Sequence, residues 1–161
     1  MVMSGDLEAI AKTLRAGAES YKDADKVKRH LQTAFTAKLT GPRSGRLYTT
    51  FFFTDKAGNV RPIGSRAPHQ ASAPGEPPAM DTGELLRRMS FSARRLPTGA
   101  EVKVKSMAEY SAFLEFGTSK MRARPYFRTT MREEAPAIQR IWRDGIVARE
   151  RAKARELGGR G

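Results

Sequence analysis

Apolar side chains recur at helical spacing in the first quarter of the chain. Between residues 7 and 39 they fall at steps of three or four, which is the period of an amphipathic helix. Thr40-Gly41-Pro42 follows as a stop signal, because Gly can close a helix and Pro cannot continue it. The pattern predicts a long N-terminal helix over about residues 6–39. Such a helix would be about 50 Å long, so we expect it either to break near Gly17 or to project from the body.

The middle of the chain is rich in aromatic and β-branched residues, and turn residues interrupt it twice. Residues 46–54 read as a strand, residues 55–59 as a turn and residues 60–63 as a returning strand. A second hairpin is predicted around Pro97-Thr98-Gly99-Ala100, with strands at about 91–96 and 101–106. Residues 101–105 alternate between polar and apolar side chains, so one face of that strand is expected to be exposed to solvent.

A proline-rich stretch separates the two hairpins. Residues 65–80 contain almost no large apolar side chain, so they predict an extended loop. Two interpretations stay open: a disordered insertion, or a segment that reaches a neighbouring molecule.

Three more helices are expected. Asp81 is the candidate N-cap of a short helix that runs to about residue 90, with Glu84 completing a capping box and with Leu85 and Leu86 directed to the core. A second short helix covers about residues 107–116. A long C-terminal helix covers residues 127–157, with Phe127, Met131, Ala135, Ile138, Ile141, Trp142, Ile146 and Val147 on its core side, before a flexible tail at residues 158–161.

These elements together predict an α+β fold. An antiparallel β-sheet built from two hairpins would be packed by helices, with a long helix at each end of the sequence. The length of 161 residues fits a single domain over residues 1–157.

The composition says little about the fold, but it excludes several classes of function. The chain has no Cys, which excludes disulfides, thiolate zinc sites and Cys nucleophiles, and its two His lie far apart in the sequence. Phosphate-binding glycine loops and the common hydrolase and metalloprotease motifs are also missing. We therefore expect a protein that is not an enzyme and that uses no cofactor or metal. No apolar run is long enough to cross a membrane, and the first ten residues do not resemble a secretory signal.

Charge points to a polyanion or to assembly with other proteins. The net charge is +13, and the excess lies in the middle of the chain and in its last 42 residues. Arginine dominates both regions, and its guanidinium binds phosphate and carboxylate equally well. A solubilising face, a protein interface and a DNA contact all fit this pattern. The candidates for contact with DNA or a neighbouring subunit are Arg43, Arg46, Arg61, Arg66 and Arg122.

Two stretches carry more information than composition. The first motif is residues 72–85, SAPGEPPAMDTGEL, and residues 41–48 precede it; the second motif is residues 109–127, EYSAFLEFGTSKMRARPYF. Caps, turns and core anchors explain these residues without a ligand. Gly117 is expected to end a helix where a Cβ would clash, Glu115 to pair with Arg124, and Pro125 to preset the first turn of the last helix.

Both motifs resemble a family of small tailed-phage (siphophage) proteins encoded among the head–tail joining and tail genes, described as tail component, minor tail or tail-completion proteins. The resemblance covers about residues 40–135, and it departs from the usual pattern at Tyr126-Phe127, where one aromatic is usual. The residues that carry it are Gly75, Pro77, Pro78, Asp81, Thr82, Gly83, Leu85, Tyr110, Leu114, Glu115, Phe116, Gly117, Thr118, Arg124, Pro125 and Phe127.

The resemblance implies a virion protein of the phage neck or upper tail. Such a protein would act in tail completion and head–tail joining as a subunit of a homo-oligomeric ring, six-fold symmetry being expected, around the DNA channel. Its partners would be neighbouring neck and tail-tube proteins, with non-specific contact to DNA and none to membrane, and it would assemble in the host cytoplasm. Two alternatives stay open: a terminator ring that caps the tail tube, and a non-specific DNA-binding protein.

Overall fold

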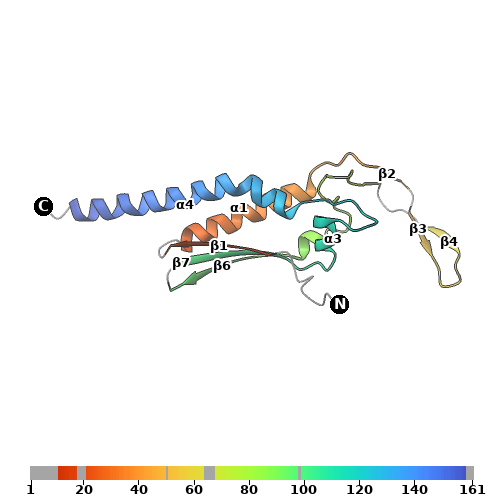
Figure 1. Ribbon diagram of the computed structural model, residues 1–161, viewed down its shortest axis with the longest axis horizontal. Helices are drawn as coiled ribbons and strands as arrows, with labels where there is room; N and C mark the ends of the chain where they lie inside the picture. The colour runs from red at the N-terminus through yellow and green to blue at the C-terminus, as the bar shows by residue number, and fades with distance from the viewer. Residues whose placement is uncertain (1–10, 18–20, 50, 64–67, 98, 159–161) are drawn as a thin grey trace.

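The computed structural model describes residues 11–17, 21–49, 51–63, 68–97 and 99–158. Its helices and small antiparallel sheets confirm the α+β class (Figure 1). In chain order the elements are β1 (Ala11–Gly17), α1 (Tyr21–Thr40), β2 (Leu47–Tyr48), β3 (Phe51–Thr54), β4 (Val60–Ile63), β5 (His69–Gln70), α2 (Glu84–Arg87), β6 (Met89–Leu96), β7 (Gly99–Ser106), α3 (Ser111–Phe116) and α4 (Phe127–Gly158).

The main sheet has three antiparallel strands in the order β1-β7-β6. The predicted second hairpin is confirmed, since β6 and β7 pair along their whole length. The prediction of a helix over residues 6–39 is wrong for residues 11–17, which form strand β1 and pair with β7. The open edge of β7 offers a row of backbone hydrogen-bond partners, and this tertiary context overrides a local helical period. Residues 1–10 and 18–20 lie outside the described residues.

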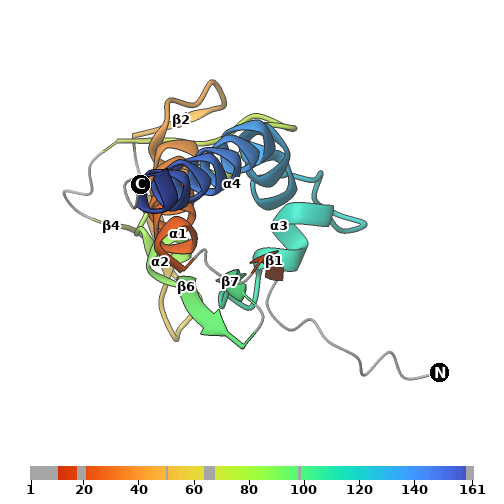
Figure 2. The same ribbon diagram turned by 90° about the vertical axis from the view of Figure 1, so that its left-hand side faces the viewer.

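Helix α1 covers one face of this sheet, and α4 lies along α1 on the other side (Figures 1 and 2). The apolar stripe of α1 is buried at every third or fourth residue, as its period predicts. Phe35 stands at the centre, with its ring 5.7 Å from that of Phe91 and 5.2 Å from that of Phe127, between centroids. The buried apolar core is Ala24, Val27, Leu31, Phe35, Leu39, Met89, Ala100, Val102, Val104, Tyr126, Phe127 and Ile138.

Strand β7 keeps the predicted alternation but is less exposed than expected. Val102 and Val104 are buried in the core, while Lys103 and Lys105 are half-buried. Glu101 is also buried and accepts a hydrogen bond from Arg94 Nε at 2.7 Å. A strand with neighbours on both edges exposes little of either face, which explains the difference.

The first predicted hairpin is confirmed in part. Strands β3 and β4 pair with each other around the turn at residues 55–59. Residues 47–48 do not extend this hairpin, because they form strand β2 and pair with β5 instead. The β3–β4 hairpin therefore stands out from the body at the end opposite the C-terminus (Figure 1).

The long loop is anchored rather than loose in its described part, residues 68–80. The N–H of Ala71 donates to the carbonyl of Arg46 at 3.0 Å, and the N–H of Gly45 donates to the carbonyl of Ala71 at 3.1 Å. This contact leaves no space for a Cβ at Gly45, which would meet the Ala71 carbonyl oxygen at 2.7 Å. Residues 65–67 lie outside the described residues.

The two short helices are shorter than predicted. Helix α2 has four residues, and its N-cap is Gly83 with no side-chain cap, so the predicted capping by Asp81 is wrong. Residues 89–90 already belong to strand β6, whose pairing with β7 takes the backbone out of the helix. Helix α3 begins at Ser111 and ends at Phe116, directly before Gly117, as predicted.

Helix α4 runs over Phe127–Gly158, as predicted, but its last third projects beyond the body (Figure 1). Ile146 is 54% exposed and Val147 is 40% exposed, so their predicted place in the core is wrong. The reason is the orientation of this part of α4: Gly145 and Arg149 face Asp23 of α1, so Ile146 and Val147 lie on other sides of the helix. Gly158 belongs to the helix, and the rest of the predicted tail lies outside the described residues.

The two long helices meet closely where α1 begins. Asp23 is buried, and its carboxylate pairs with Arg149 of α4 and with Lys26. Gly145 is buried against the same carboxylate, so a Cβ at this position would overlap it. A glycine inside a helix usually destabilises it. Here Gly145 makes room for a buried ion pair.

We expect Gly145→Ala to destabilise the protein by about 2 kcal/mol or more. Alanine gains about 1 kcal/mol of helix propensity, but displacing a buried carboxylate from its partner costs about 3–5 kcal/mol. Urea unfolding followed by the fluorescence of Trp142, the single Trp, measures the change. Gly158→Ala is the control, because a Cβ there meets nothing within 4 Å. A Gly145→Ala variant as stable as this control would contradict the packing argument.

Candidate functional site

The two motifs lie against each other and form one unit. Arg124 joins them, since its Nη1 donates to the Ser72 hydroxyl at 2.6 Å and its N–H donates to the carbonyl of Leu114 at 2.7 Å. The N–H of Gly75 also donates to the carbonyl of Ala123 at 3.3 Å. Ser72 is buried, so this junction is inside the protein.

Glu115 is the most heavily bonded residue of the second motif. Its side chain is fully buried, and its two oxygens accept the backbone N–H groups of Tyr126 at 3.0 Å, Phe127 at 2.9 Å and Arg128 at 3.0 Å. The Arg128 Nε donates to the same carboxylate at 2.9 Å. These amides open helix α4, where N–H groups have no partner within the helix and the helix dipole favours a negative charge. Glu115 therefore caps α4 from another helix.

The predicted ion pair between Glu115 and Arg124 is wrong. Arg124 bonds Ser72, and Glu115 bonds the start of α4. Pro125 lies two residues before Phe127, where α4 begins as predicted. One sequence signal could have found the true partner of Glu115: the residues before Phe127 include none of the side chains that usually cap a helix.

Gly117 fulfils its predicted role. Its φ is +75°, its N–H donates to the carbonyl of Phe113 at 2.8 Å, and a Cβ would meet the Met121 carbonyl oxygen at 2.7 Å. Backbone atoms cannot yield to a side chain as a flexible group would. The chain then turns back at Thr118, whose hydroxyl accepts the N–H groups of Lys120 and Met121 at 3.2 and 3.0 Å.

Tyr126 is the additional aromatic of the unusual pair Tyr126-Phe127, and it occupies a buried, hydrogen-bonded position. It is fully buried, and its hydroxyl donates to Ser106 Oγ at 3.0 Å, while Ser106 shares a further hydrogen bond with Ser111. Burial raises the pKa of this phenol above its usual value. The three hydroxyls tie the start of α4 to the end of β7 and to the first turn of α3.

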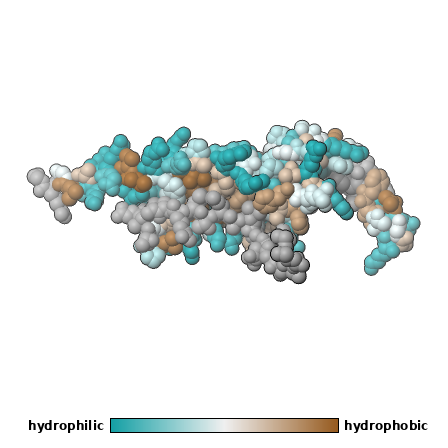
Figure 3. Space-filling model, in the orientation of Figure 1, coloured by the Kyte–Doolittle hydropathy of each residue, from teal (hydrophilic) through white to brown (hydrophobic). Residues whose placement is uncertain are grey.

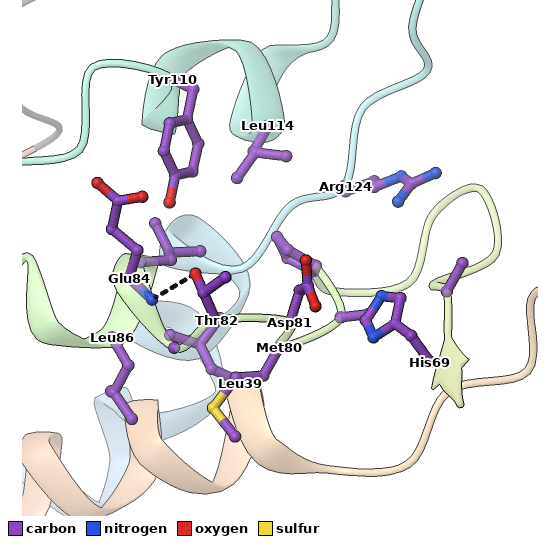
Figure 4. A pocket seen from close by; sticks show the side chains of 15 residues that line it. Leu39, His69, Met80, Asp81, Thr82, Glu84, Leu86, Tyr110, Leu114 and Arg124 are labelled. Atoms are coloured by element: carbon purple, nitrogen blue, oxygen red, sulfur yellow. Dashed lines mark hydrogen bonds between the residues drawn. The ribbon is translucent and has the colours of Figure 1, made fainter. Parts of the chain in front are cut away.

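A cleft of about 330 Å³ opens between the two motifs (Figure 4). Tyr110 and Leu114 of the second motif point toward Thr82 and Glu84 of the first, and Leu39 and Leu86 close the far side. Burial, followed by the charge of Glu84, raises the pKa of Tyr110. The predicted site residues brought together here are Pro78, Asp81, Thr82, Gly83, Leu85, Tyr110, Leu114 and Arg124.

The other motif residues lie outside this cleft. Phe127 is in the core, and Phe116 is exposed with the Arg128 guanidinium carbon 4.8 Å from its ring centre. Pro77 is half-buried and Gly75 is exposed, with a φ of +87°.

Glu76 holds the loop of the first motif. Its carboxylate accepts the hydroxyl of Ser44 at 2.6 Å, the N–H of Ala73 at 2.8 Å and the N–H of Ser44 at 3.1 Å. These hydrogen bonds, that of the Ser44 hydroxyl first, lower the pKa of Glu76 below its usual 4.5. Sequence reasoning missed this residue, although it stands among the motif prolines.

The five candidate arginines have different surroundings. Arg43 donates to five carbonyl oxygens, including that of Lys38 at 2.6 Å and that of Pro78 at 3.0 Å, so it closes the end of α1 and is engaged in the fold. Arg61 pairs with Asp55 at 3.1 Å, from Nε to Oδ2. Arg46 lies over the ring of Tyr48, and Arg122 is exposed. Arg66 lies outside the described residues.

The cleft is lined mainly by apolar side chains, together with Asp81, Glu84 and Arg124. Among the described residues no three His, Asp or Glu side chains are grouped to hold a metal ion. No described helix is both long and apolar enough to cross a membrane. Absence of enzyme activity and of a cofactor stays a prediction.

Comparison with known proteins gives no relative: no family model, no curated protein and no solved structure matches the chain.

We expect Glu115→Gln to lower the free energy of unfolding by about 3 kcal/mol. An amide offers one acceptor oxygen and a competing NH₂ group, and hydrogen bonds to a charged group are worth about 1.5–3 kcal/mol each. Urea unfolding measures the loss. Glu133→Gln is the matched control on an exposed pair with Lys38, where about 0–1 kcal/mol is expected. Equal effects of the two variants would show that Glu115 does not anchor α4.

Glu76 gives a pH dependence that can be isolated. A carboxylate whose pKa is lowered by folding contributes stability above its unfolded pKa, and this stability is lost as the pH falls through the folded pKa. The stability difference between wild type and Glu76→Gln should therefore be constant above pH 4.5, the usual pKa, and shrink as the pH falls below it. Urea unfolding at a series of pH values gives this difference, in which other carboxylates cancel. A difference that grows toward low pH would contradict the assignment.

Proposed function

We propose that the chain is a structural protein of a tailed-phage virion, located in the neck or upper tail. It acts in tail completion and head–tail joining as a subunit of a ring around the DNA channel. One observation carries the proposal: the two motifs that resemble the phage family form a single interlocked unit, joined by the hydrogen bonds from Arg124 to Ser72 and from the N–H of Gly75 to the carbonyl of Ala123. The motif residues thus serve a common scaffold, which is what a shared assembly role requires.

The outline of the molecule supports a role in assembly. The body carries the β3–β4 hairpin at one end and the last third of α4 at the other (Figure 1). Both extensions expose apolar side chains, among them Phe52 and Ile146. Extensions of this kind suit contacts between unlike surfaces of adjacent subunits, and such contacts close into a ring when the rotation is right. Six subunits per ring is the copy number that we propose.

Charge supports a place beside DNA. The chain carries +13, and Arg46 and Arg122 are exposed among the described arginines of its basic middle and C-terminal parts. Cations that line a channel hold the phosphate backbone without reading sequence. The same charge favours the second candidate, a non-specific DNA-binding protein, and the experiment below separates the two.

We expect a nonsense mutation in the gene, in its own phage, to give DNA-filled heads beside unattached tails in electron micrographs. Wild-type protein supplied from a plasmid is the control and should restore whole particles. Mass spectrometry of purified wild-type virions should detect the protein. Abnormally long tails would instead assign it to the terminator ring. Normal particles without the protein would overturn the virion role and leave DNA binding, which weakens linearly in log affinity against log salt.

A further inference from the structure

An apolar arm extends from the body. We give this name to residues 51–63, which comprise β3, its turn and β4. Phe52 is 61% exposed, Phe53 is 47% exposed and Val60 is 66% exposed. Phe52 and Phe53 are neighbours on one strand, so they point to opposite faces of the hairpin. The arm therefore presents aromatic side chains on two sides, and brown side chains mark it on the face shown in Figure 3.

The strand pairing of the arm lies within the arm itself. Strands β3 and β4 form a two-stranded sheet and pair with each other alone among the described strands. Asp55 fixes the turn, because its Oδ1 accepts the N–H groups of Ala57 at 3.0 Å and Asn59 at 2.9 Å. Hairpins of two strands are marginal alone in water, and exposed aromatic side chains on both faces add to the need for a cover. A preformed arm loses little further freedom on docking.

The same chain carries a complementary recess. The cleft between the motifs holds about 330 Å³ and is lined by Leu39, Leu86, Tyr110 and Leu114. Its volume falls at the lower end of the range for sites that enclose a small organic ligand, so it can receive aromatic side chains. The fit is one of apolar side chains, since Glu84 at the cleft is paired with Arg88 and Arg61 on the arm is paired with Asp55, each at 3.1 Å.

We propose that the apolar arm of one copy docks in the cleft between the motifs of a second copy. The arm points away from its own body (Figure 1). It leaves β2 at Tyr48 and returns to β5 at His69, so short connectors would have to reverse it before it could reach its own cleft. Arm and cleft are unlike surfaces, so the contact is head-to-tail and can repeat around a ring. The inference rests on the ring assembly in the proposed function and names its interface.

Salt separates this contact from binding to a polyanion. Two copies with a charge of +13 each repel one another, and added salt screens this repulsion. Apolar docking should therefore hold or strengthen as salt is raised, whereas contact with DNA should weaken.

The first test is cross-linking, which the absence of native Cys makes clean. We expect a mixture of the single variants Thr54→Cys and Met80→Cys to give a covalent dimer with a short bismaleimide. Thr54 is exposed and lies two residues from Phe52 on the same face of the arm, and Met80 lines the cleft. Leu157→Cys, which is more exposed than Met80 and lies at the far end of α4, replaces Met80→Cys as the control and should give none. A double variant carries both the arm Cys and Met80→Cys in one chain. If it cross-links only within that chain, the proposal is overturned in favour of an arm folded onto its own cleft.

The second test is self-association of the full chain, measured by sedimentation velocity. We expect Phe52→Ser with Phe53→Ser, and separately Thr82→Trp to fill the cleft, to weaken association about tenfold or more. Met107→Ser, on an exposed apolar residue that belongs neither to the arm nor to the lining of the cleft, is the control and should have no effect. Thr82→Trp leaves the arm intact, so its effect cannot come from an unfolded hairpin. A wild-type chain that stays monomeric at about 100 µM, where a contact of ~µM Kd would be saturated, would overturn the proposal.

The two proposals fail separately. A chain that is present in virions but monomeric in solution contradicts the arm contact alone. A chain that associates through its arm but is absent from virions contradicts the phage role alone.

Discussion

One buried carboxylate holds the parts of this protein together. Glu115 belongs to α3, yet its oxygens accept the first three amides of α4 and the side chain of Arg128. The residues before Phe127 supply no capping side chain, so without Glu115 these amides would be buried without an acceptor, which is costly. Because the position of α4 is fixed at this point, Tyr126 and Phe127 enter the core in one register.

The consequences of that cap pass through the aromatic core to the sheet. Phe127 packs on Phe35 of α1, and Phe35 packs on Phe91 of β6. At the far end of the helix pair, the Asp23 carboxylate bonds Arg149 and fills the space left by Gly145. Two buried carboxylates thus set the register of α4 on α1 at both ends. Apolar contact between the two helices also holds them together, but it is less directional than these hydrogen bonds.

Sequence reasoning succeeded where the signal is local. The turn at residues 55–59, the hairpin of β6 and β7 and the end of α3 at Gly117 each follow from residues within a few positions. It failed where contacts with residues far away in the sequence determine the structure. Residues 11–17 are a strand because β7 offers an edge, and Ile146 is exposed because its neighbours Gly145 and Arg149 are the residues that face α1. Three of the four hydrogen bonds to Glu115 come from backbone amides eleven to thirteen residues away, and a search for pairs of charged side chains in the sequence does not reveal these bonds.

The same division explains why the motifs describe the scaffold better than the surface. The first motif and the residue before it bond to the segment at residues 41–48: Glu76 to Ser44, Arg43 to Pro78, and Ala71 to Gly45 and Arg46. Those bonds fix β2 against β5, and the apolar arm begins and ends at these two strands. The residues that carry the family resemblance thus bond within the protein. The side chains that we propose to meet a partner belong to the arm, which lies in the sequence between residues 41–48 and the first motif. The scaffold sets the direction of the arm, and the exposed aromatics of the arm, Phe52 and Phe53, determine what it can bind.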